Sequence, residues 1–130
     1  MQKPDSWYAY FHIRGSFDLD DITRRTSVAP TKTARQGDAI GDGSKERPCS
    51  LWALYSRLEP SASLENHVTD VLQQLDANHE AFEKLGREFD CTLQLVGSFR
   101  NVNPGVHFDS ETLQKAATYG VAIDCDFYNC

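Results

Sequence analysis

The strongest pattern in the chain is a run of apolar residues spaced three and four apart between Ser63 and Phe89, typical of a helix with one buried stripe. The stripe consists of Leu64, Val68, Val71, Leu72, Leu75, Phe82, Leu85 and Phe89. Ser63 is expected to cap the start, because its hydroxyl can accept a hydrogen bond from a first-turn N–H. Asp76 and Asn78 interrupt the stripe with poor helix formers, so the pattern predicts a kink or two abutting helices.

Four segments alternate between apolar and polar residues, the period-two pattern of a strand with one buried face. They lie at residues 7–14, 50–58, 91–99 and 121–128. The side chains expected to face the core are Trp7, Ala9, Phe11, Ile13, Trp52, Leu54, Leu58, Cys91, Leu93, Leu95, Phe99, Val121, Ile123, Cys125 and Phe127. Residues 31–38 are polar and basic and predict a weaker edge strand.

Two shorter helices are expected at residues 18–26 and from about residue 109 to 119. Asp18 and Asp109 open these segments in a similar way, which leaves open an arrangement of two ferredoxin-like halves. Helices mixed with mainly antiparallel strands predict one α+β domain over residues 1–130. Its single, mainly antiparallel sheet would carry helices on one face, as a two-layer sandwich.

Length and charge narrow the possible functions. A chain of 130 residues can bury a core within one domain, and 19 acidic against 13 basic residues give a net charge of −6. This charge argues against binding to nucleic acid or an anionic membrane, and it suits a basic protein partner. There is no apolar signal segment and no run near the roughly 18 residues of a membrane span, so a cytoplasmic location is expected. The cysteines expected there as free thiols are Cys49, Cys91, Cys125 and Cys130.

No residue pattern points to a catalytic or metal centre. The four histidines lack the paired Cys or His ligands of a zinc site. The glycine-rich run at residues 41–45 lacks the spacing of a phosphate-binding loop and precedes a strand. There is no Gly-x-Ser-x-Gly, and His67 lies beside the apolar stripe, where a structural histidine is the simpler interpretation. We therefore expect a non-enzymatic protein with no metal and no cofactor.

The polar positions of the strands carry an unusual set of side chains. They are Tyr8, Tyr10, His12, Arg14, Tyr55, Arg57, Gln94, Arg100, Asp124, Asp126 and Tyr128. If helices cover one side of the sheet, these residues gather on the other, and Tyr, Arg and His make a good recognition surface because they bury much area while keeping polar tips. An ordinary solvated face with cross-strand Arg–Asp pairs is the alternative. Aromatic sheet faces also bind nucleic acids, but the acidic balance opposes that reading.

Several short motifs occur in order along nearly the whole chain. They are Tyr8-Ala9-Tyr10-Phe11, Asp21-Ile22-Thr23, Pro30-Thr31-Lys32-Thr33, Gly37-Asp38, Leu51-Trp52-Ala53-Leu54, Leu64-Glu65-Asn66-His67, Asn103-Pro104-Gly105-Val106-His107-Phe108 and Ile123-Asp124-Cys125-Asp126. Residues 103–105 also predict a turn. Together the motifs resemble the bacterial domain-of-unknown-function family 4279. The resemblance implies a small cytoplasmic α+β domain with no established activity, similar to some immunity proteins that neutralise toxins of neighbouring bacteria.

Two functional hypotheses follow. In the first, the protein is a non-enzymatic binding domain, in its most concrete form an immunity-type inhibitor whose acidic surface covers a basic toxin. In the second, it is a small ligand-binding domain or enzyme with a pocket between the sheet face and residues 31–48. Residues 39–48 read as a flexible loop. Lys32, Arg35 and Asp38 would then matter most.

Overall fold

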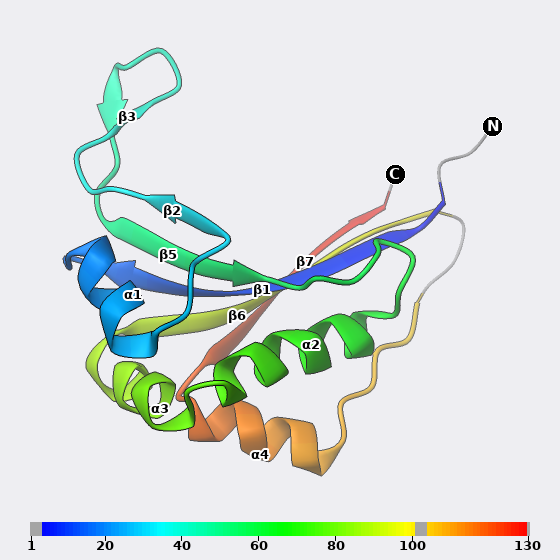
Figure 1. Cartoon of the computed structure of the whole chain (residues 1–130). Helices are drawn as coiled ribbons and strands as arrows, with labels where there is room; N and C mark the ends of the chain where they lie inside the picture. The colour runs from blue at the N-terminus through cyan, green and yellow to red at the C-terminus, as the bar shows by residue number, and fades with distance from the viewer. Residues whose placement is uncertain (1–3, 101–103, 130) are drawn as a thin grey trace.

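The computed structural model describes residues 4–100 and 104–129. The elements shown in Figure 1 are β1 (Ser6–Gly15), α1 (Leu19–Thr26), β2 (Lys32–Ala34), β3 (Ala39–Ile40), β4 (Lys45–Glu46), β5 (Ser50–Tyr55), α2 (Leu64–Asp76), α3 (His79–Glu88), β6 (Asp90–Phe99), α4 (Ser110–Thr118) and β7 (Ala122–Asn129). The turn predicted at residues 103–105 begins outside the described ranges, and Cys130 lies outside them. Within those ranges, no helix combines the length and apolar character needed to cross a membrane.

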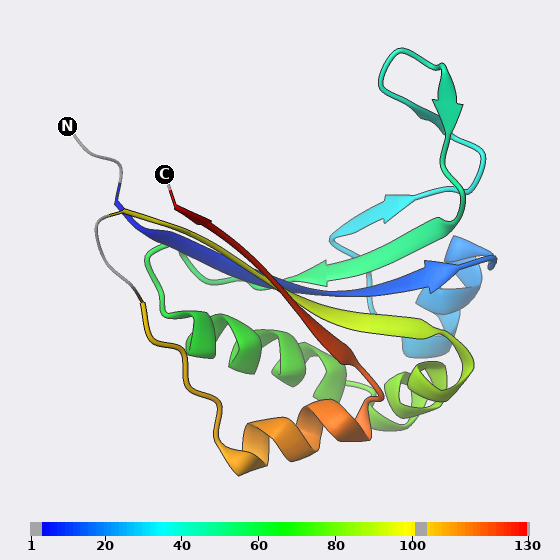
Figure 2. The ribbon, with the colours of Figure 1, turned by 180° about the vertical axis from the view of Figure 1, so that it is seen from behind.

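Five strands form one sheet in the order β2-β5-β1-β6-β7. The β2–β5, β5–β1 and β1–β6 pairs are antiparallel. β6 and β7 are parallel, because α4 carries the chain back along the sheet between them. The helices lie on one side of the sheet, as the two opposite views in Figures 1 and 2 show. The predicted α+β architecture, a mainly antiparallel sheet with helices on one face, is confirmed.

The similar openings of the two short helices correspond to similar local structure. The Asp18 carboxylate accepts a hydrogen bond from the Asp20 N–H at 3.0 Å, and the Asp109 carboxylate accepts one from the Thr112 N–H at 2.8 Å. Both helices connect parallel strands of the same sheet, β1 with β2 and β6 with β7. The first strands of these two segments, β1 and β6, pair with each other within one continuous sheet.

The long apolar stripe forms two helices, one of the predicted alternatives. α2 ends at Asp76 and α3 begins at His79, and the Ser63 hydroxyl accepts a hydrogen bond from the Asn66 N–H at 3.1 Å as predicted. Every stripe residue except the partly buried Phe89 is at most 2% exposed. Each large buried side chain contributes roughly 1.5–3 kcal/mol. The stripe packed against the sheet is therefore a main source of stability.

Two strand predictions are wrong about burial. β5 ends at Tyr55, so Leu58 lies in the following loop and is 39% exposed instead of in the core. In β7 the alternation is present, but Ile123 and Phe127 are 41% and 42% exposed, and Cys125 is exposed too. β7 is one of the two edge strands, and the exposure of all eight of its residues shows that no element among the described residues covers it.

Residues 39–48, predicted as a flexible loop, contain the β3–β4 hairpin, which projects above one end of the sheet in Figures 1 and 2. Gly41 has a φ of 61°, a left-handed conformation that glycine adopts without strain and that permits the tight tip. At the base, the Arg47 N–H donates to the Asp38 carbonyl at 2.8 Å, and the Asp38 carboxylate accepts from the Arg35 N–H at 3.3 Å. Arg35 and Asp38, the alternative binding residues, thus lie where the hairpin leaves the sheet.

Candidate functional site

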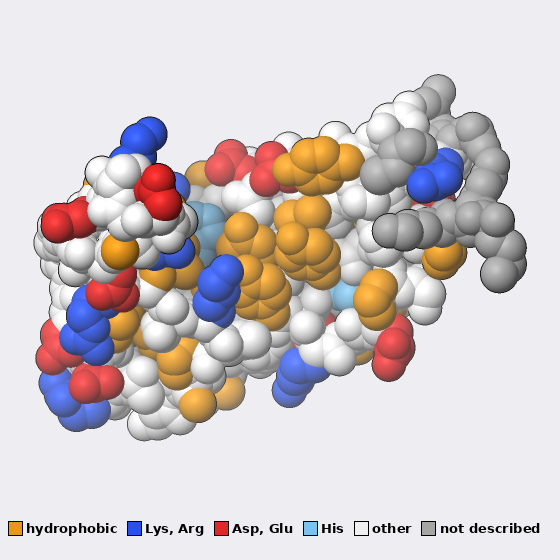
Figure 3. Space-filling view, turned by 90° about the horizontal axis from the view of Figure 1, so that it is seen from above, with side chains coloured by type: hydrophobic (Ala, Val, Ile, Leu, Met, Phe, Trp, Pro, Cys, Tyr) orange, Lys and Arg blue, Asp and Glu red, His pale blue; other side chains and the backbone are white. Residues whose placement is uncertain are grey.

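The side of the sheet opposite the helices, here named the open face, carries every second side chain of the strands. The strand register places on it Tyr8, Tyr10, His12, Arg14, Lys32, Leu51, Ala53, Tyr55, Thr92, Gln94, Val96, Asp124, Asp126 and Tyr128. Figure 3 looks onto this face: side chains of the hydrophobic class, which includes tyrosine, gather in the middle, and acidic side chains line part of the border. The residues predicted for the recognition face are brought together here, with the exception of Arg57 and Arg100, which follow the ends of β5 and β6.

Three tyrosines form a stack in the middle of the open face. Tyr10 and Tyr55 lie directly opposite each other on β1 and β5, and their ring centroids are 4.4 Å apart with planes 6° from parallel. Tyr8 stacks on Tyr55 at 6.0 Å. Burial, followed by the neighbouring phenols Tyr55 and Tyr8, raises the pKa of Tyr10, so its hydroxyl stays protonated. The stack is a neutral aromatic platform with polar tips.

His12 continues this row on β1 and is only 6% exposed. Its ring lies 5.6 Å from that of Tyr10, and its Nδ1 atom is buried with no hydrogen-bond partner among the described residues. Burial, and after it the charge of Arg14, lowers the pKa of His12, while Gln94 and two nearby carboxylates oppose that shift. The imidazole is therefore neutral at pH 7 and has an unused polar atom.

Charge divides the open face. Exposed Arg14 and Lys32 lie toward β2, whereas Asp124 and Asp126 lie on β7 at the opposite edge. The Gln94 amide donates to the Asp126 carboxylate at 2.8 Å. Neither aspartate forms an ion pair with another described residue. The sequence places Lys32 in the alternative loop site, but in the structure it shares the open face with the tyrosines.

Arg57 does not lie on the open face, because β5 ends two residues earlier and the strand alternation ends with it. Its guanidinium instead pairs with Asp70 on α2 at 2.8 Å, and its backbone N–H donates to the same carboxylate at 2.8 Å. Burial disfavours the charge on Asp70, but the hydrogen bonds from Arg57 and then Gln74 hold its pKa below the usual value. Arg57 attaches the loop after β5 to the helical layer.

A polar cluster that sequence reasoning missed joins three helical segments on the opposite side of the sheet. The fully buried Tyr119 donates its hydroxyl hydrogen bond to Asp76, and His79 Nδ1 lies 3.0 Å from the same hydroxyl. Lys115 binds the other Asp76 oxygen at 2.7 Å. Burial and the Asp76 carboxylate both raise the pKa of Tyr119. These residues come from α2, α3 and the end of α4, so no sequence spacing could have revealed the cluster, which fastens α4 to its neighbours.

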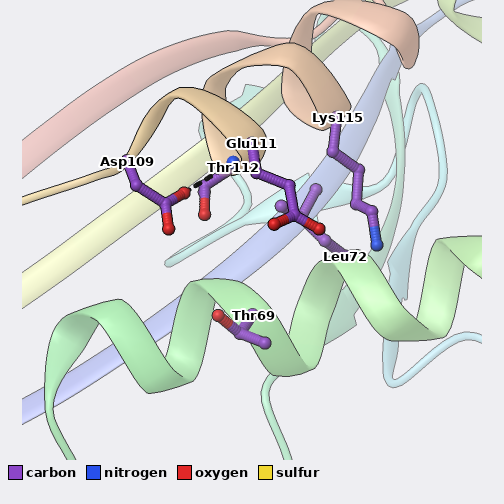
Figure 4. Close-up of a pocket in the computed structure, with 6 residues that line it drawn as sticks. All are labelled: Thr69, Leu72, Asp109, Glu111, Thr112 and Lys115. Atoms are coloured by element: carbon purple, nitrogen blue, oxygen red, sulfur yellow. Dashed lines mark hydrogen bonds between the residues drawn. The ribbon is translucent and has the colours of Figure 1, made fainter.

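Beside this cluster, α2 and α4 enclose a hollow of about 210 Å³ lined by Thr69, Leu72, Asp109, Glu111, Thr112 and Lys115 (Figure 4). Asp109 is engaged in capping α4 through the Thr112 N–H, the dashed contact in Figure 4, and Lys115 is paired with Asp76. Ligand pockets usually measure about 300–1,000 Å³. The hollow is small, and both Asp109 and Lys115 are already engaged within the protein, so it is a weaker candidate than the open face.

One serine lies beside a histidine among the described residues. The Ser56 hydroxyl lies 2.6 Å from His67 Nδ1, but His67 is fully buried. The predicted burial of His67 is confirmed. Within the described ranges, no three His, Cys, Asp or Glu side chains are placed to hold a metal ion. The open face is therefore retained as the candidate functional site.

Comparison with known proteins identifies the family. Residues 5–130 match the family described as "Domain of unknown function (DUF4279)". Since the match covers nearly the whole chain, the protein belongs to this family, as the motifs indicated. No curated protein and no solved structure shows a significant match to the chain.

Proposed function

We propose that this member of the DUF4279 family is a non-enzymatic protein-binding domain that docks its partner on the open face. The observation that supports the proposal is the stack of Tyr8, Tyr10 and Tyr55 at the middle of a sheet face that no helix covers. Tyrosine is enriched among the residues that dominate binding energy, above all near the centre of an interface. Because a tyrosine side chain has only two torsion angles, fixing it in an interface costs little conformational entropy.

Charge indicates the kind of partner. The net charge of −6 favours a partner with a basic contact surface, and so do Asp124 and Asp126, which form no ion pair with another described residue. The most specific form of the proposal is an immunity-type inhibitor, acting in the bacterial cytoplasm, that covers a basic toxin. Association with such a partner should slow as salt rises, while dissociation changes less.

The test is kinetic binding of variants to a partner captured from the native host, after circular dichroism confirms folding. We expect Tyr10→Ala or Tyr55→Ala to weaken the complex by about 2 kcal/mol, or about thirtyfold. Leu113→Ala is the matched control, because Leu113 is 49% exposed on α4, on the helical side. Full affinity of both tyrosine variants would refute the proposal.

His12 favours a second candidate function, a small-ligand site on the open face beside the β3–β4 hairpin. His12 Nδ1 is buried and has no hydrogen-bond partner among the described residues, so a ligand hydroxyl, amide or carboxylate could pair with it only after the neighbouring side chains move aside. If this candidate function is correct, substitutions of Lys32, Arg35, Asp38 and His12 should weaken ligand binding more than substitutions of the tyrosines. Screening a fragment library by NMR would test it: chemical-shift changes clustered at His12 and residues 31–48 would support it, and none there would exclude it.

A further inference from the structure

The free edge of β7 is the least protected part of the sheet. β7 runs for eight residues, pairs with β6 on one side only, and has every residue exposed. In Figure 2 it crosses the front of the sheet with no other element beside its outer edge. An unprotected edge presents a row of unpaired backbone N–H and C=O groups that can pair with another strand. Proteins usually protect edges with proline, bulges, short strands or charges, and β7 has only its charges, Asp124 and Asp126.

The two sides of β7 differ in chemistry. Asp124, Asp126 and Tyr128 lie on the open face, while Ile123 and Phe127 project on the helix-facing side and are 41% and 42% exposed. The edge therefore alternates between acidic and apolar positions. A strand added to it would place its own alternate side chains opposite these two sets.

The same alternation disfavours pairing of β7 with β7 of a second copy. A two-fold antiparallel pairing centred on Cys125 puts Asp124 opposite Asp126 of the other copy, twice. Centring it on either aspartate puts that residue opposite itself. Like charges directly opposite each other in a sheet are destabilising. Registers centred on Ile123 or Phe127 avoid these contacts but pair fewer residues of β7. A strand that brings positive charge to the open-face positions can pair along the whole edge.

We propose that the free edge of β7 accepts an extended segment of the partner protein as a sixth strand, with Lys or Arg opposite Asp124 and Asp126 and apolar residues at the intervening positions. Main-chain hydrogen bonds supply affinity in this mode, and alternate side chains supply specificity. This inference rests on the proposed function, which supplies the basic partner. An added strand extends the open face past β7, so that one partner contacts both the edge and the tyrosines.

A charge-reversal experiment tests the alternation. The probe is an acetylated, fluorescently labelled ten-residue peptide that alternates Lys with Val, and its counterpart carries Glu in place of Lys. By fluorescence anisotropy we expect the Lys peptide to bind the full chain and the Glu peptide to bind at least about tenfold more weakly. Asp124→Lys combined with Asp126→Lys should reverse that preference. Glu46→Lys combined with Glu59→Lys is the matched control, because it changes net charge equally at exposed positions outside β7 and should keep the original preference.

Backbone pairing is tested by N-methylation of the Lys peptide at alternate amides, which removes their N–H donors. Two versions are made, and each blocks the N–H groups along one of the two edges of the extended peptide. Only the version that blocks the edge facing β7 should lose binding. Equal binding of both versions, failure of the charge reversal, or concentration-dependent dimerisation of the wild-type chain in sedimentation would overturn the inference.

The outcomes separate this inference from the proposed function. If peptide binding fails but a captured partner still depends on Tyr10 and Tyr55, the edge inference is wrong and docking on the open face stands. If the peptide preference reverses as expected but the partner binds the tyrosine variants with full affinity, strand addition at β7 stands and docking on the tyrosine stack does not.

Discussion

β1 and β7 have the same alternating pattern but opposite surroundings. Ile13 on β1 is fully buried, while Ile123 on β7 faces the same side of the sheet and is 41% exposed. Phe11 and Phe127 differ in the same way, at 1% and 42%. β1 has a strand on each side and α2 packed against it, whereas β7 is at the edge. Alternation therefore specifies which side chains share a face, and position in the sheet decides whether that face is buried.

The polar sides of the two strands repeat the lesson. His12 on β1 is 6% exposed although no helix covers its face, because neighbouring strands supply side chains around it. Asp124 and Asp126 on β7 are exposed. A polar residue in the centre of this sheet is thus better buried than an apolar residue at its edge.

Matched isoleucines would give the largest difference in stability. Ile13→Ala should lower the free energy of unfolding by about 2–5 kcal/mol, the usual cost of a large-to-small change in a packed core. Ile123→Ala should cost well under half as much, because much of that side chain already contacts water. Urea denaturation of both variants measures the difference. Equal losses would mean that β7 is covered in solution.

A substitution at Gly86 tests how closely the helices pack near the start of β7. A Cβ atom at Gly86 on α3 would overlap the Tyr119 carbonyl oxygen, so the backbone must shift. We expect Gly86→Ala to destabilise by about 1–3 kcal/mol despite its better helix propensity. Gly105→Ala is the control, since no atom of the described residues lies within 4 Å of its added methyl group. A thermal melt in which the two variants coincide would contradict this packing.

The burial of His12 predicts a pH effect. Its pKa is lowered in the folded state, by burial first and then by Arg14, so the unfolded chain binds more protons near and below the ordinary pKa of about 6.5. The stabilisation is present above that pH and is lost as pH falls toward the folded-state pKa. His67 contributes with the same sign, because burial lowers its pKa too. Urea melts at pH 7.5 and 5.5 should show lower stability at pH 5.5, and His12→Gln should reduce that difference. An unchanged difference would argue that His12 is accessible.

Cysteine labelling distinguishes the core of the sheet from its β7 edge without substitution of any residue. Cys91 on β6 is 2% exposed, and burial raises the pKa of its thiol to about 12. Cys125 projects on the same side from β7 but is exposed. Iodoacetamide treatment of the native protein at pH 8, read by peptide mass spectrometry, should modify Cys125 well before Cys91. Simultaneous modification would indicate that the edge and the core open together.

Part of the candidate site could be predicted from sequence because period-two alternation is local. It correctly placed Tyr8, Tyr10 and His12 on one face and indicated that Tyr55 and Asp124 would join them. It failed for Arg57, because the end of β5 depends on pairing with β1 and not on the alternation itself. It also gave no sign of the cluster around Tyr119, whose members come from three separate elements.

The sequence by itself determined the apolar stripe of α2 and α3, the break between them, the capping residues and the two faces of each strand. These features depend on residues a few positions apart, where backbone geometry sets which side chains share a side. Only the tertiary structure decided that β1 and β6 occupy the centre of the sheet, that β7 lies at its edge and that the tyrosines stack across β1 and β5. Each depends on contacts between segments distant along the chain, and the same local alternation is compatible with a central strand or an edge strand.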